Sequence, residues 1–126
     1  MSGNEPRTIN HSDNFDHDTP QYVNRRLYEL EQFFQEMPEA MSKAEEAYAD
    51  AEEAHAMAEA WARLEADGRD VATRDAQVFE ATGETRKALR VADSALKYAK
   101  RKVQAANSER EVLVTRSVNM RNQMKG

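Results

Sequence analysis

Apolar residues follow one another along residues 23–62 in alternating steps of four and three. This heptad rhythm keeps one face of an α-helix turned toward a partner helix. Thr19 and Pro20 supply a helix start, because the hydroxyl can cap the first turn and proline lacks only an N–H that would be unpaired there. The pattern predicts a helix over residues 20–66 with a kink near Pro38, whose ring removes a backbone donor. The seam positions are Val23, Leu27, Leu30, Phe34, Met37, Met41, Ala44, Tyr48, Ala51, His55, Ala58 and Ala62.

The same rhythm returns in the second half of the chain and predicts a second helix over residues 71–124. Asp70 and Thr73 are both candidate N-caps for it. Gly83 is a weak point at which this helix can bend, because glycine costs about 1 kcal/mol relative to alanine inside a helix. The seam positions here are Val78, Thr82, Thr85, Leu89, Ala92, Leu96, Ala99, Val103, Ala106, Arg110, Leu113, Ser117, Met120 and Met124.

Asp67 and Gly68 separate the two stripes and predict a turn over residues 67–70, with the glycine in the left-handed conformation that ends many helices. So short a link makes the two helices antiparallel neighbours. If the sequence is reflected about Gly68 to pair the two helices, Tyr48 lies near Leu89. Helices of this length are not stable alone in water, so each seam must be covered by the other. The sequence therefore predicts an all-α fold, a long antiparallel helical hairpin of the coiled-coil kind.

A second apolar row lies beside the first on the first helix. A helix with two apolar rows usually has two neighbours, so we expect a homo-oligomer in which hairpins assemble into a larger helical bundle, or docking onto another protein. The second row consists of Phe33, Ala40, Ala47, Ala54 and Trp61. The residues expected to make protein contacts are Phe33, Phe34, Met41, Tyr48, Trp61, Leu89 and Leu96.

Residues 1–18 are polar and show no apolar period, which predicts a flexible N-terminal arm in front of a hairpin over residues 19–126. The chain has no cysteine, which excludes disulfides and thiolate metal sites. It has no apolar run long enough to span a membrane and no signal-peptide layout at its start. The expected location is the cytoplasm, that of the host cell if a phage encodes the chain.

The net charge of −5 conceals two halves of opposite sign. Residues 20–67 carry twelve acids and four bases, whereas residues 84–126 carry four acids and eleven bases. The basic half offers two candidate nucleic-acid contacts. One is the segment with Lys97, Lys100, Arg101 and Lys102, for which pairing with Glu36 and Glu39 of the first helix is the favoured alternative. The other is the end with Arg110, Arg116, Arg121 and Lys125, which the same reflection places opposite Arg25 and Arg26 and away from acids.

The sequence contains few features that would support catalysis or metal binding. No nucleophile stands beside a base, and no glycine-rich loop has phosphate-binding spacing. Glu52 and His55 have a spacing seen in di-iron bundles, but the second helix has no histidine, so His55 is expected to be a polar seam residue. The acids near residues 13–18 lack the order of a calcium loop. We expect no enzyme activity, no metal and no cofactor.

Two stretches resemble short phage-encoded helical proteins that are often encoded beside phage single-strand annealing or single-strand-binding genes. The first is Ala47–Thr82, with the turn Gly68-Arg69-Asp70-Val71-Ala72-Thr73-Arg74-Asp75-Ala76. The second is Glu109–Met124, with Arg116-Ser117-Val118-Asn119-Met120-Arg121. The resemblance implies a phage accessory factor in DNA recombination or replication that acts through protein contacts, with weak or partner-dependent nucleic-acid binding.

Two other functions stay open. A phage structural or assembly protein, such as a scaffold or virion component, would also present a helical hairpin and a polar arm. An inhibitor of a host defence nuclease would use an acidic face that mimics nucleic-acid phosphate. That face consists of Glu45, Glu46, Asp50, Glu52 and Glu53.

Overall fold

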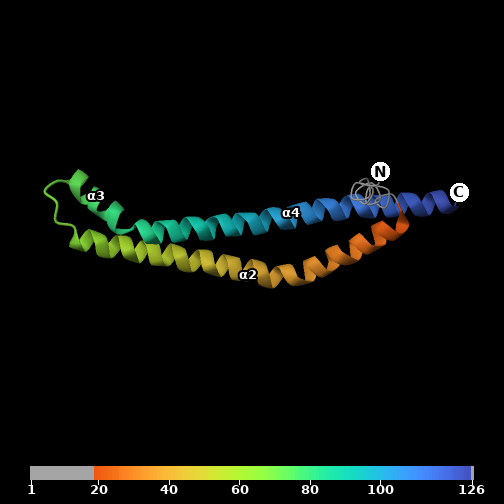
Figure 1. The fold of residues 1–126 in the computed structure, drawn as a ribbon, viewed down its shortest axis with the longest axis horizontal. Coiled ribbons are helices and arrows are strands. Elements are labelled where there is room, and N and C mark those ends of the chain that lie inside the picture. Colours follow the sequence, from red (N-terminus) through yellow and green to blue (C-terminus); the bar gives the residue numbers. More distant parts are fainter. Residues whose placement is uncertain (1–18, 126) are drawn as a thin grey trace, which may run out of the picture. The chain divides into compact units, whose positions relative to one another are not determined.

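The computed structural model describes residues 19–125, without the side chain of Lys125, and all its elements there are helices. They are α2 (Pro20–Glu65), α3 (Val71–Ala81) and α4 (Gly83–Lys125). The long helices α2 and α4 pack antiparallel, and the short α3 lies between them in the chain (Figure 1). The predicted all-α helical hairpin is therefore confirmed. The arm predicted over residues 1–18 lies outside the described residues.

The start of α2 follows from its first residues. The hydroxyl of Thr19 accepts a hydrogen bond from the N–H of Tyr22 at 3.1 Å, which is the predicted cap. The helix then runs through Pro38 without a break. The kink there stays a prediction, but Pro38 marks a division of another kind, because the chain separates into two compact units at this residue.

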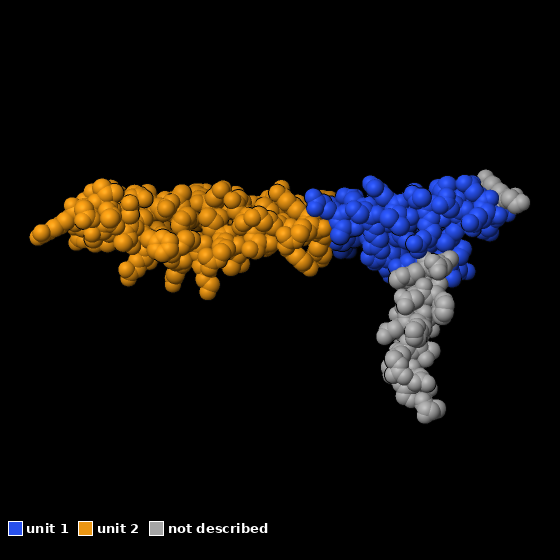
Figure 2. Space-filling view, turned by 90° about the horizontal axis from the view of Figure 1, so that it is seen from above, with its two compact units in different colours: residues 1–37, 103–126 blue, residues 38–102 orange. Residues whose placement is uncertain are grey.

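Each unit is a pair of antiparallel helix segments, coloured separately in Figure 2. The first unit contains the described residues up to Met37 together with those from Val103 onward. The second unit contains Pro38–Lys102, and with it α3 and the link between the long helices. The sequence pattern does not separate the two, because the heptad stripes run through both boundaries.

The first unit has the larger apolar core. Val23 and Leu30 of α2 meet Ala106 and Leu113 of α4, and all four are buried. Other apolar side chains, which are only partly buried, pack against this cluster. They are Tyr22, Leu27, Phe33, Phe34 and Met120. Burying side chains of this size contributes about 1.5–3 kcal/mol each, which makes this cluster the main apolar anchor of the first unit.

The second unit has a thinner core. Its buried residues are Ala62, Val78, Thr82 and Leu96. Many seam positions are alanine, which lets two helices approach closely but removes little apolar surface from water. The seam also contains a polar contact, since Nδ1 of His55 lies 3.0 Å from Oγ1 of Thr85. His55 is thus a polar seam residue, as the sequence predicted.

The link between α2 and α3 covers residues 66–70 and is held by one glutamine. The N–H groups of Asp67 and Gly68 both donate to Oε1 of Gln77 at 3.1 Å, and Nε2 of Gln77 donates to Asp67 at 2.9 Å. Asp70 then caps α3 by accepting from the N–H of Thr73 at 2.7 Å. This hydrogen bond holds the pKa of Asp70 below its ordinary value.

The prediction that Gly68 adopts a left-handed conformation is wrong. No described residue has a positive φ angle. The glycine is needed for space instead: a Cβ at this position would lie 2.6 Å from Cγ2 of Thr73 and 3.1 Å from the backbone nitrogen of Arg74. The first turn of α3 therefore packs directly on the backbone of the link.

The prediction of one continuous second helix is also wrong. Thr82, with φ −105° and ψ 17°, separates α3 from α4, next to the predicted weak point at Gly83. Its buried hydroxyl donates to the carbonyl of Val78 at 2.8 Å, which is a common way for threonine to disturb a helix. Arg86 bridges the interruption, because Nη1 donates to the carbonyl of Phe79 at 3.0 Å and the guanidinium lies 3.6 Å from the centre of the Phe79 ring.

Candidate interaction surfaces

Most of the predicted protein-contact residues serve the hairpin itself. Leu96 is buried, and Phe33 and Phe34 pack against the core of the first unit. Half-buried positions are also occupied by Met41, Tyr48 and Leu89. Among this predicted set only Trp61 is largely exposed, at 63%.

A larger apolar surface is exposed elsewhere. On α2, Trp61 forms a stripe with Met57 and Leu64 at steps of four and three, and all three are more than half exposed. On α4, Val91 and Tyr98 are exposed one heptad apart. The heptad spacing of these residues is a signal in the sequence that could have identified them, but of this group only Trp61 belongs to the apolar row predicted beside the seam. Further exposed apolar residues are Tyr28, Val71, Phe79, Val112, Val114, Val118 and Met124.

An open apolar groove lies between α2 and α4 in the second unit. Its volume is about 680 Å³. Small side chains produce it, since methyl groups on both helices leave the space between them unfilled. Glu84 and Lys87 are the charged residues that line it. The apolar lining consists of Ala47, Ala51, Ala88, Val91, Ala92 and Ala95.

Near the link, the two helices pair in a register that differs from the one predicted by reflecting the sequence about Gly68. That reflection places His55 opposite residue 81, whereas the contact is made by Thr85, one helical turn further along. The link over residues 66–70 and the interruption at Thr82 use more chain than a tight turn would. On its own helix, Glu59 lies 3.9 Å from Nε2 of His55.

The end of the hairpin that was expected to lack acid partners contains a two-point ion pair. Nε and Nη2 of Arg26 donate to the two carboxylate oxygens of Glu109 at 2.6 and 2.9 Å. Nη1 of Arg26 also donates to Glu29 at 3.0 Å. These hydrogen bonds, above all those to Glu109, raise the pKa of Arg26. The expectation that Arg26 faces the basic residues of α4 without an acid nearby is wrong, because Glu109 lies at the next position along α4.

The four basic residues predicted at this end have different surroundings. Arg110 is exposed and lies 4.9 Å from the centre of the Phe34 ring, a cation–π distance. Arg116 is half-buried and makes at least one polar, charged or ring interaction with a neighbouring residue. Arg121 is exposed. Lys125 ends α4, and its side chain lies outside the described part of the structure.

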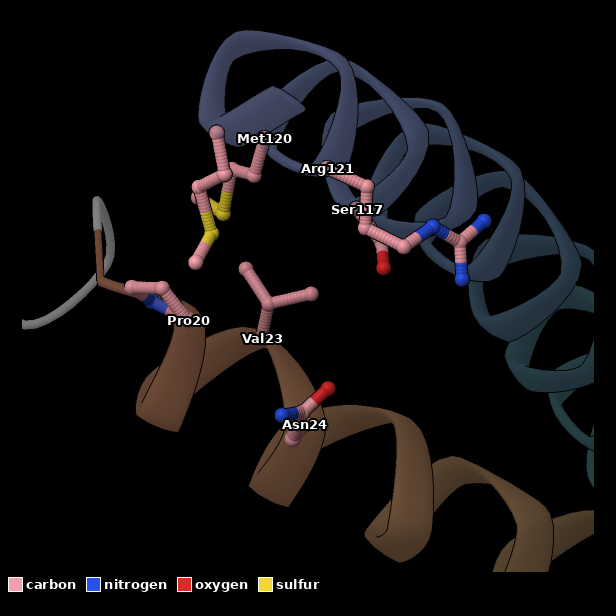
Figure 3. Close-up of a pocket in the computed structure, with 7 residues that line it drawn as sticks. Pro20, Val23, Asn24, Ser117, Met120 and Arg121 are labelled. Carbon is pink, nitrogen blue, oxygen red and sulfur yellow. The ribbon is translucent and has the colours of Figure 1, made fainter.

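Arg121 also lines a cavity of about 340 Å³ between the start of α2 and the end of α4. Figure 3 shows Val23 pointing from α2 toward α4, with Met120 directed back toward it. Arg121 extends from α4 to one side of this pair (Figure 3). The other lining residues are Pro20, Asn24, Ser117 and Met124.

The other predicted basic segment lies on the second unit. Lys97 makes an ion pair with Asp93 at 3.0 Å on its own helix, and Lys102 lies 5.6 Å from the centre of the Tyr98 ring. Lys100 and Arg101 are exposed. Glu39, expected as an interhelical partner, lies 3.4 Å from Lys43 of α2. The ion pairs of Lys97 and Glu39 thus run along each helix rather than across the seam.

The described residues contain no group of three histidine, aspartate or glutamate side chains that could hold a metal. None of the helices described here combines the length and the apolar character needed to cross a membrane. The sequence matches no known protein family, and no curated protein or solved structure is significantly similar to it.

Proposed function

We propose that the chain is a non-enzymatic interaction protein, a phage accessory factor in DNA recombination or replication that acts through contacts with other proteins. The observation that supports an interaction role is that more large apolar side chains are exposed than apolar residues are buried. Seven apolar residues are buried among those described, whereas twelve large apolar side chains are exposed. Exposed apolar residues that form stripes mark surfaces that another protein covers.

The step from interaction to DNA metabolism rests on the resemblance of Ala47–Thr82 and Glu109–Met124 to phage helical proteins. The basic half of the chain fits this proposal. Arg121 is exposed, and Arg110 presents its guanidinium beside an aromatic ring, an arrangement that suits a phosphate with a stacked base. The acidic helix α2 opposes free DNA binding, so contact with nucleic acid is weak or depends on the partner protein.

Two alternatives remain as outcomes of the test. A scaffold or virion component would use the same apolar stripes to join an assembly. An inhibitor of a host nuclease would use the acidic residues of α2, of which Asp50 and Glu53 are exposed and Glu52 accepts a hydrogen bond from the hydroxyl of Tyr48 at 3.2 Å.

The test is affinity capture of the tagged full chain from phage-infected cells, followed by mass spectrometry. The proposal expects a phage single-strand annealing or single-strand-binding protein, and expects its loss when Trp61 and Leu64 are both replaced by glutamate. The matched control replaces Ala49 and Ala56 by glutamate, which adds the same charge at exposed positions of the same helix. Capture of virion proteins would contradict the proposal in favour of assembly, and capture of a host nuclease would favour the inhibitor.

A further inference from the structure

We propose that the face of the second unit with the alanine groove binds the same face of a second copy of the chain, with a two-fold axis parallel to the helices. In this dimer α2 of each copy lies over α4 of the other. The inference rests on the proposed interaction role but not on DNA contact.

The apolar content of this face extends beyond the groove. Trp61 lies two heptads after Ala47, so both share one side of α2, and Tyr98 lies one heptad after Val91 on α4. Both aromatic side chains are more than half exposed. The face therefore combines a floor of small residues, which lets helices approach closely, with large apolar side chains that have little cover within their own chain.

The size of the face fits a stable dimer. The segment of α2 in this unit, residues 38–65, is roughly 40 Å long at 1.5 Å per residue. Two neighbouring helices make a face about 20 Å wide. The product is about 800 Å² per copy, which is the area that each partner contributes to a standard interface.

Charge identifies the occupant as a second copy and sets its orientation. Within the second unit, residues 38–65 of α2 carry eight acids and two bases, whereas residues 83–102 of α4 carry two acids and seven bases. A two-fold axis along the helices places each acidic segment over a basic one. A two-fold axis across the helices, in the plane of the face, would place like charges over one another, which is unfavourable. The face is thus complementary to itself in one of the two orientations.

One specific pair follows from the register. His55 is level with Thr85, so Asp50, five residues earlier on α2, lies within about one helical turn of the level of Lys87, two residues later on antiparallel α4. Asp50 lies one turn after Ala47 at the outer edge of the grooved face, Lys87 lines the groove from the outer side of α4, and both are exposed. They are on opposite edges of their own chain, but in the dimer Asp50 of one copy meets Lys87 of the other.

The face is tested by two lysine substitutions measured by sedimentation equilibrium of the full chain. Ala47→Lys places a charge in the groove, over the partner's basic helix, and should raise the dimer dissociation constant at least about tenfold. Ala49→Lys is the control, because two residues turn the side chain by about 200° to the opposite face. Its dissociation constant should stay within about twofold of the wild-type value. Circular dichroism checks that both variants keep their helix content.

The orientation is tested by Asp50→Lys and Lys87→Glu at low salt. Each variant alone creates two repulsive pairs in the dimer and should dissociate about tenfold more readily. An equimolar mixture restores both pairs in the heterodimer, which should form with nearly the wild-type dissociation constant. A mixture no tighter than the separate variants would overturn the orientation. A wild-type chain that stays monomeric at tens of micromolar, or equal loss with Ala47→Lys and Ala49→Lys, would overturn the proposed face, whatever the result of affinity capture.

Discussion

Arg26 and Glu109 lie 83 residues apart in the sequence and form a two-point ion pair across the first unit, with nitrogen–oxygen distances of 2.6 and 2.9 Å. Both side chains are about one-third exposed, so solvent screens the pair in part. The paired donors match the carboxylate geometry, which fixes the register of α2 against α4 at this end.

Replacing Glu109 by Gln should therefore lower the free energy of unfolding by about 1 kcal/mol, since one neutral contact replaces a charged two-point contact. The matched control is Glu111→Gln, two residues away at an exposed position. Thermal unfolding followed by circular dichroism measures both. Because the pKa of Arg26 is raised, its charge contributes at all pH values below its ordinary pKa, so the arginine introduces no loss of stability between pH 6 and pH 9. Equal stability of the two variants would contradict the role of the pair.

Gly68 and Gly83 should respond to alanine in opposite directions. Gly68→Ala brings a Cβ within 2.6 Å of Thr73 and should destabilise the chain by about 1–3 kcal/mol. Gly83→Ala meets only the end of Arg86 at 3.7 Å and should stabilise it by up to about 1 kcal/mol, because alanine favours the helix. Urea unfolding of both variants provides the comparison. An equal effect of the two substitutions would show that the close approach at Gly68 is absent.

The cap at Asp70 predicts a pH dependence. Its pKa is lowered by the hydrogen bond from Thr73, so the stability that it contributes is present above its ordinary pKa and is lost as the pH falls through the lowered value. Asp70→Asn keeps a capping oxygen but cannot titrate. The difference in melting temperature between the wild type and this variant should shrink as the pH is lowered from 7 to 3. A difference that does not change with pH would exclude the carboxylate as the titrating cap.

The sequence predicts the hairpin well because the hairpin depends on local rules. Heptad spacing identifies both long helices, Thr19 caps the first, and Asp70 caps the segment after the link. The sequence did not predict the interruption at Thr82, because this threonine occupies a regular seam position in the heptad stripe. A hydrogen bond from its hydroxyl to the carbonyl of Val78 cannot be recognised from the spacing of apolar residues.

The candidate surfaces were harder to predict, because exposure depends on which of two apolar rows turns inward. The seven predicted contact residues were selected largely from the seam, so Leu96 proved to be buried in the hairpin. The pair of Arg26 with Glu109 was missed for a different reason. The reflection about Gly68 placed Arg110 opposite Arg26, and a shift of one position changes a repulsive neighbour into an attractive one.

Nucleic-acid binding, if the basic end provides it, should depend strongly on salt. We expect weak, sequence-tolerant binding of single-stranded DNA, alone or with the partner protein, that falls as salt rises because each phosphate contact releases counterions. Replacing Arg116, Arg121 and Lys125 by Gln should weaken it, because phosphate contacts are lost while good helix formers are retained. Fluorescence anisotropy of a labelled oligonucleotide measures this. The control replaces Lys43, Arg63 and Arg69 by Gln, which changes the net charge equally in the second unit.

No anisotropy change at low salt, alone or with the partner, would contradict the DNA contact and leave the assembly function as the better explanation. Equal weakening by both triple variants would show that net charge, rather than the basic end, governs the binding.

Site-specific photo-crosslinking in phage-infected cells tests the interaction role most directly. A photoreactive residue replaces Trp61 in one strain and Ala56, an exposed residue elsewhere on α2, in the other. We predict that position 61 crosslinks to a phage single-strand annealing or single-strand-binding protein as well as to a second copy of the chain, and that position 56 crosslinks to neither. Crosslinks from position 61 to virion proteins, or equal labelling from both positions, would contradict the account.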